Sequence, residues 1–156
     1  MFDELRQLYQ EVILDHGTRP RNYHGLDDAT CQADGSNPVC GDMFTVYLKV
    51  APDGTVADAA FEGKGCAISI ASASMMTEVL RGKTEAEARR LFEDFHRLCT
   101  EDGFTLDQAA AEDRDALERL QVLSGVREFP VRVKCATLAW HAMASALDGA
   151  DETTTE

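Results

Sequence analysis

The sequence predicts an α+β fold, and three observations lead to that class. Apolar residues recur with helical spacing near both ends of the chain, over 2–17 and 130–147. A strictly alternating segment over 43–50 precedes a turn and a second strand-like segment, which together predict an antiparallel hairpin. At 156 residues the chain can bury a core without disulfides. We expect one domain over 1–148 and a polar, disordered tail over 149–156.

Composition and charge exclude several classes of protein. The hydrophobic fraction of 44% and the charged fraction of 28% are ordinary for a globular domain. A net charge of −13 argues against nucleic-acid binding, because phosphates repel an acidic surface. The chain has no run of eighteen apolar residues, so we expect no membrane span. The N-terminal segment is acidic and amphipathic, unlike a signal peptide, which predicts a cytoplasmic protein.

The first predicted helix covers the N-terminal segment and ends near Gly17. Its apolar residues recur at intervals of three and four: Phe2, Leu5, Leu8, Tyr9, Val12 and Ile13. Pro20 and Gly25 then mark a loop, and a short strand is expected around 29–33. His16 is expected to act at the helix end rather than as a metal ligand.

The predicted hairpin consists of strands over 43–50 and 56–63, joined by the turn "APDGT". In the first strand, alternation places on the inward face Phe44, Val46, Leu48 and Val50. In the second strand, the same reasoning places on the inward face Ala57, Ala59 and Phe61. The hairpin thus supplies the apolar face against which the helices are expected to pack.

Helices are predicted over most of the remaining chain. The pattern changes to helical spacing after Gly65 and ends at Gly82. Thr84 and Glu87 form a capping-box pattern that opens a helix to about residue 98. The acidic segment 99–128 is expected to hold one or two short helices. Pro130 then suits the first turn of a last, long helix.

The cysteines raise the question of a metal site. They number five and are widely scattered: Cys31, Cys40, Cys66, Cys99 and Cys135. In a reducing compartment this pattern favours metal binding or thiol chemistry over disulfides. An antiparallel hairpin returns its second strand to the edge where the first began. Cys40 and Cys66 therefore come close, and the last helix can bring Cys135 to the same edge.

Asp42 is the candidate fourth donor, because Gly41 allows the backbone to curl so that Cys40 and Asp42 converge. A set of three thiolates and one carboxylate suits a tetrahedral site for a divalent ion such as zinc. Taken singly, each residue also has a plainer interpretation, as a buried cysteine or a turn aspartate. We assign Cys31 and Cys99 to core packing. The spacing alone leaves the metal site and the structural interpretation both open.

Three stretches of the sequence carry a resemblance: "NPVCGD", "FEGKGCAISIASASMMTEVLRGK" and "FPVRVKCATLAW". They are similar to the signature segments of the IscU/NifU-like superfamily of iron–sulfur cluster assembly, and the similarity covers essentially the whole chain. The resemblance implies a three-stranded antiparallel sheet packed against several helices. It also implies metal ligation by Cys40, Asp42, Cys66 and Cys135.

Two departures indicate a branch of this superfamily. IscU-type scaffolds carry a histidine immediately before the third cysteine, where this chain has Lys134. The spacer of 68 residues between Cys66 and Cys135 is longer than in the scaffold form. Both features resemble the SufU branch of zinc-dependent sulfurtransferases.

The resemblance to that branch implies a sulfur relay that depends on Zn²⁺. Cys40 would accept persulfide sulfur from a SufS-type cysteine desulfurase and pass it to the cluster-building scaffold machinery. Arg132, one turn before Cys135, is a candidate to offset the negative site or to meet the partner, and a solvated arginine is the alternative. Two other functions stay open. One is an IscU-type scaffold that builds an iron–sulfur cluster on the same cysteines, and the other is a metal-stabilised protein-binding module.

Overall fold

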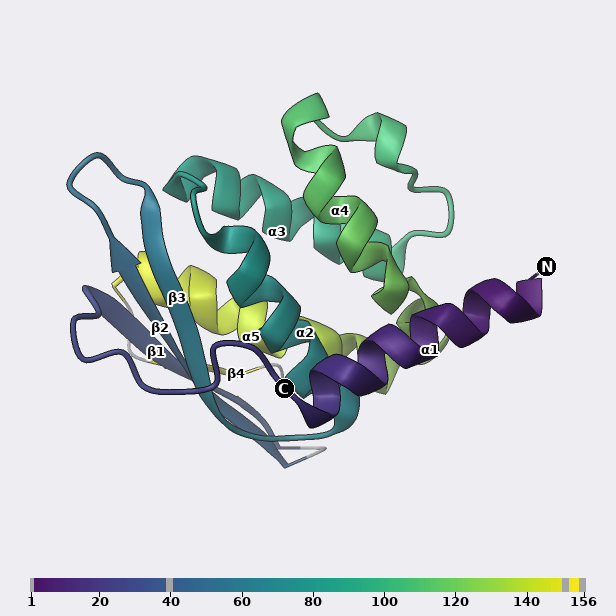
Figure 1. Ribbon diagram of the computed structural model, residues 1–156, viewed down its shortest axis with the longest axis horizontal. Helices are drawn as coiled ribbons and strands as arrows, with labels where there is room; N and C mark the ends of the chain where they lie inside the picture. Colours follow the sequence, from purple (N-terminus) through teal and green to yellow (C-terminus); the bar gives the residue numbers. More distant parts are fainter. Residues whose placement is uncertain (1, 39–40, 150–151, 155–156) are drawn as a thin grey trace.

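The sheet and its helices form layers. The computed structural model describes residues 2–38, 41–149 and 152–154, the last segment and 2–6 by backbone alone (Figure 1). Figure 1 shows the sheet at one side, α2 and α5 against it, and α3 and α4 beyond them. The helices are α1 (Phe2–Thr18), α2 (Ala67–Leu80), α3 (Glu85–Thr100), α4 (Arg114–Leu120) and α5 (Pro130–Leu147). The α+β class predicted by the sequence is confirmed. No helix in the described part of the chain combines the length and apolar character that a membrane span demands.

The expected three-stranded antiparallel sheet is also confirmed. Its strands are β1 (Cys31–Asn37), β2 (Asp42–Val50) and β3 (Val56–Lys64), in the order β3-β2-β1. The β1 strand begins and ends later than the sequence indicated, because pairing with β2 rather than local propensity sets its length. The four connecting residues, 38–41, include two that lie outside the described residues, Val39 and Cys40.

A fourth strand was not expected from the sequence. β4 (Glu152–Thr154) pairs in parallel with β1, with Asp34 opposite Glu152 and Ser36 opposite Thr154. The prediction of a disordered tail is therefore wrong for 152–154. The physical reason is that β1 offers an open edge of backbone donors and acceptors, which a polar segment can pair with. Composition does not reveal such a partner.

The alternation along the hairpin is largely as predicted. Phe44, Val46 and Leu48 are buried, as are Ala59 and Phe61. Ala57, however, is exposed, so its predicted inward orientation is wrong. The register shifts beside Val50, which pairs with Val56, whereas Lys49 pairs with Asp58. The extra residue forms a bulge that turns Ala57 outward.

The helix boundaries follow the local signals in the sequence. The Glu87 backbone N–H donates to the Thr84 hydroxyl, and the Thr84 backbone N–H donates to the Glu87 carboxylate, which confirms the predicted capping box. Pro130 occupies the first turn of α5, as expected. Within the acidic segment, α4 is accompanied by short 3₁₀ turns: Leu106–Gln108, Ala111–Asp113 and Gln121–Glu128.

Direct contacts fix α2 and α5 against each other and α5 against β1. The hydroxyl of Ser72 on α2 donates to the Ala136 carbonyl of α5 over 2.5 Å, and the Trp140 indole N–H donates to Ser72 Oγ over 3.2 Å. On the sheet side, a Cβ added to Gly35 would lie 3.2 Å from side-chain atoms of both Leu138 and Ala142. These contacts hold the two helices together and place α5 on the inner face of β1.

His16 joins α1 to α2 instead of serving the helix end. The imidazole is buried, and Nδ1 lies 2.8 Å from the Ser74 hydroxyl of α2. Its Nε2 lies 3.8 Å from Glu78 Oε1. Burial is the main cause that lowers the pKa of His16, and the nearby Arg21 adds to it, while Glu78 and Asp15 oppose it. The fold therefore favours the neutral imidazole.

This preference predicts that stability falls as the solution is acidified. Because the folded pKa of His16 lies below its ordinary value of 6.5, the unfolded chain binds more protons between the two values, and the free energy of unfolding rises with pH there. Chemical denaturation from about pH 7.5 down to about pH 5, the range in which histidine titrates, should show this loss in the wild type. His16→Gln should flatten the slope, although part remains because burial also lowers the pKa of His141. An equal slope in the wild type and in His16→Gln would contradict the prediction.

Candidate metal centre

Three of the four predicted ligands lie together at one end of the sheet. Asp42 opens β2, Cys66 immediately precedes α2, and Cys135 lies in the second turn of α5. One carboxylate oxygen and the two sulfurs all lie within 4.8 Å of one another. Sulfurs bound to a single zinc ion at about 2.3 Å stand roughly 3.8 Å apart, so this set needs only a small contraction. Cys40, two residues before Asp42, lies outside the described residues.

Asp42 divides its two oxygens between two tasks. The carboxylate is buried, and Oδ1 accepts a hydrogen bond of 3.1 Å from the Cys66 backbone N–H. Oδ2 is buried and has no hydrogen-bond partner among the described residues. A buried carboxylate oxygen without a partner is costly, and a cation would offset that cost. Asp42 therefore fits a metal ion with one oxygen while the other oxygen ties the hairpin to α2.

Cys66 is the exposed member of the set. It has extended backbone angles at the N-cap of α2, where the helix dipole favours negative charge. Its sulfur lies 3.5 Å from the Ser69 hydroxyl, which in turn donates to the Cys66 carbonyl over 3.0 Å. The start of α2 thus orients this thiol.

Cys135 is the buried member, with 3% of its surface exposed. The side-chain amide of Asn37, at the end of β1, donates towards its sulfur over 3.9 Å. The sequence analysis did not identify Asn37. Asn37 is the first residue of "NPVCGD" and follows Ala33 and Gly35 on the inward face of β1. A polar residue at an inward position, where an apolar one is expected, could have identified it.

The glycine before Cys66 allows these elements to approach. A Cβ added to Gly65 would lie 2.3 Å from Ser69 Oγ and 2.8 Å from Asp42 Oδ1. Gly41 adopts a φ of +76°, and its N–H donates to the Asn37 carbonyl over 2.8 Å, which closes the turn predicted before Asp42. The turn and the close approach together aim Asp42 at the start of α2.

The sequence also singled out Arg132, Cys31 and Cys99, and none of them belongs to the cluster of donor atoms. Arg132 is exposed, and its guanidinium carbon lies 4.8 Å from the centroid of the Phe129 ring. Its predicted role beside the site stays a prediction. Burial raises the pKa of Cys99 to about 12 and raises that of Cys31 as well, so both thiols fit the packing role assigned to them.

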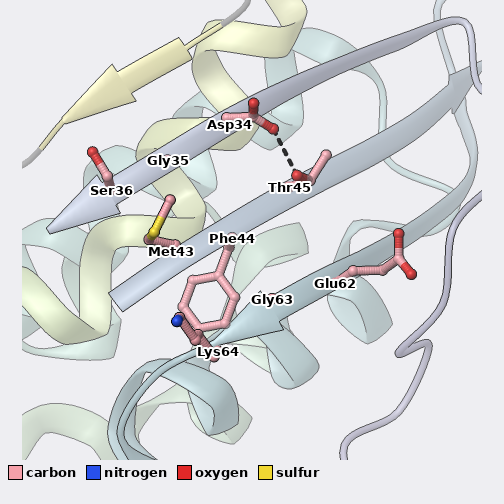
Figure 2. Close-up of a pocket in the computed structure, with 9 residues that line it drawn as sticks. All are labelled: Asp34, Gly35, Ser36, Met43, Phe44, Thr45, Glu62, Gly63 and Lys64. Atoms are coloured by element: carbon pink, nitrogen blue, oxygen red, sulfur yellow. Dashed lines mark hydrogen bonds between the residues drawn. The ribbon is translucent and has the colours of Figure 1, made fainter. Parts of the chain in front are cut away.

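The outer face of the sheet carries a separate hollow, of about 650 Å³ (Figure 2). Figure 2 shows Asp34 hydrogen-bonded to Thr45 across β1 and β2, with Glu62 and Lys64 on β3. None of the three clustered ligands lines this hollow, because alternation turns Asp42 inward and Met43 outward. The hollow is open and polar along one side, and it is distinct from the candidate metal centre.

The sheet, the helices and the cluster of two cysteines and an aspartate define a class of α+β protein with a candidate metal site. Over residues 8–153 the sequence matches the family model described as the NifU-like N terminal domain. The chain belongs to this family.

Named relatives and a solved structure agree with that assignment. The chain is 40% identical over 142 residues to the zinc-dependent sulfurtransferase SufU of Bacillus subtilis, covering 89% of this chain and 88% of that protein. It is 39% identical over 142 residues to the iron–sulfur cluster assembly scaffold protein IscU of Thermotoga maritima, covering 91% and 94%. The crystal structure of a NifU-like protein (N-terminal) from Brucella abortus is 30% identical, covers 90% of this chain and 92% of its own, and has a TM-score of 0.77. The resemblance stated from the sequence is confirmed at the level of the family.

Substitution at Gly65 tests whether the close approach is tight. Gly65→Ala should lower the free energy of unfolding of the metal-free protein by about 1–3 kcal/mol, because the methyl group collides with Ser69 and Asp42. Urea denaturation measures this change. Gly103→Ala is the matched control, since a Cβ there meets nothing within 4 Å. If both variants were as stable as the wild type, the packing around Gly65 would be looser than described.

Proposed function

We propose that the protein is a zinc-dependent sulfurtransferase of iron–sulfur cluster assembly. The observation that carries the proposal is the convergence of Asp42, Cys66 and Cys135, together with the unpartnered Oδ2 of Asp42. Cys40 is proposed as the fourth ligand on the basis of its place two residues before Asp42. Three thiolates and a carboxylate suit zinc in both number and type of donor.

The proposed reaction needs a nucleophilic thiolate. Bound zinc would keep the cysteines deprotonated near neutral pH without oxidising them. The Cys40 thiolate attacks the outer sulfur of a persulfide on the desulfurase. The S–S bond of that persulfide breaks, the desulfurase cysteine leaves as a thiolate, and Cys40 becomes the persulfide. Asp42, Cys66 and Cys135 hold their positions throughout, since each is anchored to a separate structural element.

The proposed partners follow from this chemistry. A SufS-type cysteine desulfurase would supply the sulfur, and a scaffold complex for cluster assembly would receive it. The Bacillus subtilis relative is named as a zinc-dependent sulfurtransferase, which supports this proposal. The relay needs cysteines that are not locked in disulfides, which suits a reducing compartment such as the cytoplasm.

A scaffold that builds an iron–sulfur cluster on the same residues is the second candidate. The Thermotoga maritima relative, which is named as such a scaffold, supports it, and thiolates also bind iron well. Lys134 and the long spacer between Cys66 and Cys135 favour the sulfurtransferase. A metal-stabilised binding module without thiol chemistry would need the same ligands but no reactive Cys40.

An isosteric change at Asp42 distinguishes its proposed role as a zinc ligand from its role as the acceptor of the Cys66 N–H. In Asp42→Asn the amide oxygen can still accept from the Cys66 N–H, but an NH₂ group replaces the free oxygen. Zinc affinity, measured by competition with a chromophoric chelator, should fall roughly tenfold or more. The melting temperature of the metal-free protein should change little, because the acceptor of the Cys66 N–H is kept and one buried polar atom replaces another. Chelation should lower the melting temperature of the wild type, since the metal joins the hairpin to both helices.

Two control variants show whether a loss of zinc affinity in Asp42→Asn reflects a lost ligand or a disturbed fold. Asp42→Ala should lose both zinc affinity and about 1–3 kcal/mol of metal-free stability, because the Cys66 N–H also loses its acceptor. Asp34→Asn, on the outer face of the sheet, should behave as the wild type. Zinc affinity unchanged in Asp42→Asn would remove Asp42 from the ligand set.

The function itself is tested by the turnover of a SufS-type desulfurase. Zinc-loaded protein should stimulate turnover strongly, and metal-stripped protein should not. Cys40→Ser should abolish stimulation, and mass spectrometry should find the persulfide on Cys40 of the wild type. If the stripped protein instead assembled a coloured cluster from iron and sulfide while zinc blocked activity, the scaffold would be the correct function. Persulfide acceptance by Cys40→Ser at the wild-type rate would overturn the role of Cys40.

A further inference from the structure

Asn37 is a buried amide that lies against the candidate metal centre. It ends β1 and has none of its surface exposed. Its Nδ2 donates towards the Cys135 sulfur over 3.9 Å, a reach that suits the large sulfur atom. Its Oδ1 is buried and has no hydrogen-bond partner among the described residues. A buried amide with part of its capacity unused is uncommon and calls for a reason.

The turn that follows β1 does not require this side chain. The Asn37 backbone carbonyl accepts the Gly41 N–H over 2.8 Å, and Asn37 pairs in register with Asp42. Among the described residues, a bond between backbone atoms thus closes this turn. Since Asn37 and Asp42 lie directly opposite each other on the inward face, the amide is adjacent to one predicted ligand and hydrogen-bonded to another.

The packing of α5 on β1 explains why Asn37 meets Cys135. Inward positions of β1 alternate from Ala33 through Gly35 to Asn37. The close approach of Leu138 and Ala142 to Gly35 brings α5 along this face. Asn37 lies two residues after Gly35 on β1, and Cys135 lies about one turn before Leu138 on α5. These two residues are therefore the next to meet. An apolar side chain would satisfy the core at this position, so packing alone does not account for an amide.

The chemistry of an N–H donor beside a thiolate supplies the reason. A hydrogen bond to a thiolate stabilises its negative charge and reduces its nucleophilicity, and a neutral amide does so without adding a charge. Donors of this kind around metal ligands orient the ligand and tune its affinity for the metal. Cys135 is also buried, whereas Cys66 is exposed. The sulfur of Cys135 is thereby suited to stay on the metal.

We propose that Asn37 is a positioning residue of the metal centre. Its Nδ2–H donates to the metal-bound Cys135 thiolate and keeps that sulfur a permanent ligand, so that ligand exchange and sulfur acceptance take place at Cys40. This inference rests on the proposed function, because it requires the metal. It adds Asn37 as the residue that distinguishes the Cys135 sulfur, which stays on the metal, from the Cys40 sulfur, which reacts.

Metal-binding measurements on Asn37→Asp test the proposal apart from sulfur transfer. The change keeps the shape of the side chain but replaces the N–H donor with a carboxylate oxygen. Zinc affinity should fall about 10–100-fold. In the Co²⁺-substituted protein, the sulfur-to-cobalt charge-transfer band should move to lower energy, since the thiolate regains electron density. A merely structural role would not move this band.

Asn22→Asp is the matched control. The Asn22 side chain donates to Thr77 Oγ1 over 2.9 Å and accepts from Arg81 over 2.6 Å, about three turns of α2 away from Cys66. This variant should keep the wild-type zinc affinity and cobalt spectrum. Wild-type affinity and spectrum in Asn37→Asp, or equal losses in both variants, would overturn the proposal. Failure of the wild type to bind either zinc or cobalt would instead overturn the proposed function.

Discussion

The hydrogen bond from the Cys66 N–H to Asp42 Oδ1 joins the two parts of the fold on which the site depends. It links the first residue of β2 to the start of α2 across a separation of 24 residues. Gly65 makes the contact possible, because any side chain there would occupy the same space. Because Oδ1 accepts from the backbone, the carboxylate is held in place, while Oδ2 has no hydrogen-bond partner among the described residues.

The second structural constraint is the contact between α2 and α5. Ser72, Ala136 and Trp140 fix these helices to each other, and Gly35 lets α5 lie close on β1. Cys66 and Cys135 are therefore supplied by two rigid helices, and Asp42 by a sheet. A site built on such elements is positioned more precisely than one built on loops alone. The proposed exchange of ligands at Cys40 takes place against this fixed background.

The donor set differs in exposure as well as in chemistry. Cys66 is exposed, Cys135 and Asp42 are buried, and the amide of Asn37 lies against the buried sulfur. This difference in exposure is compatible with the proposal that the buried ligands stay on a metal while a more exposed thiol reacts. Both the sulfurtransferase and the scaffold need a thiolate-rich site, so the family does not by itself distinguish between them. What distinguishes them is which sulfur leaves the metal and what it reacts with.

Local periodicity, turn residues and short motifs were sufficient to predict the helices, the hairpin, the capping box at Thr84 and the family. The hairpin also indicated that Cys40 and Cys66 come close, and the last helix could bring Cys135 to the same edge. The bulge at Ala57, the pairing of 152–154 with β1 and the burial of His16 against Ser74 became evident only in the folded structure. It alone revealed Asn37 beside Cys135, across 98 residues of sequence. These features depend on partners distant in the chain, and no local pattern encodes the identity of such a partner.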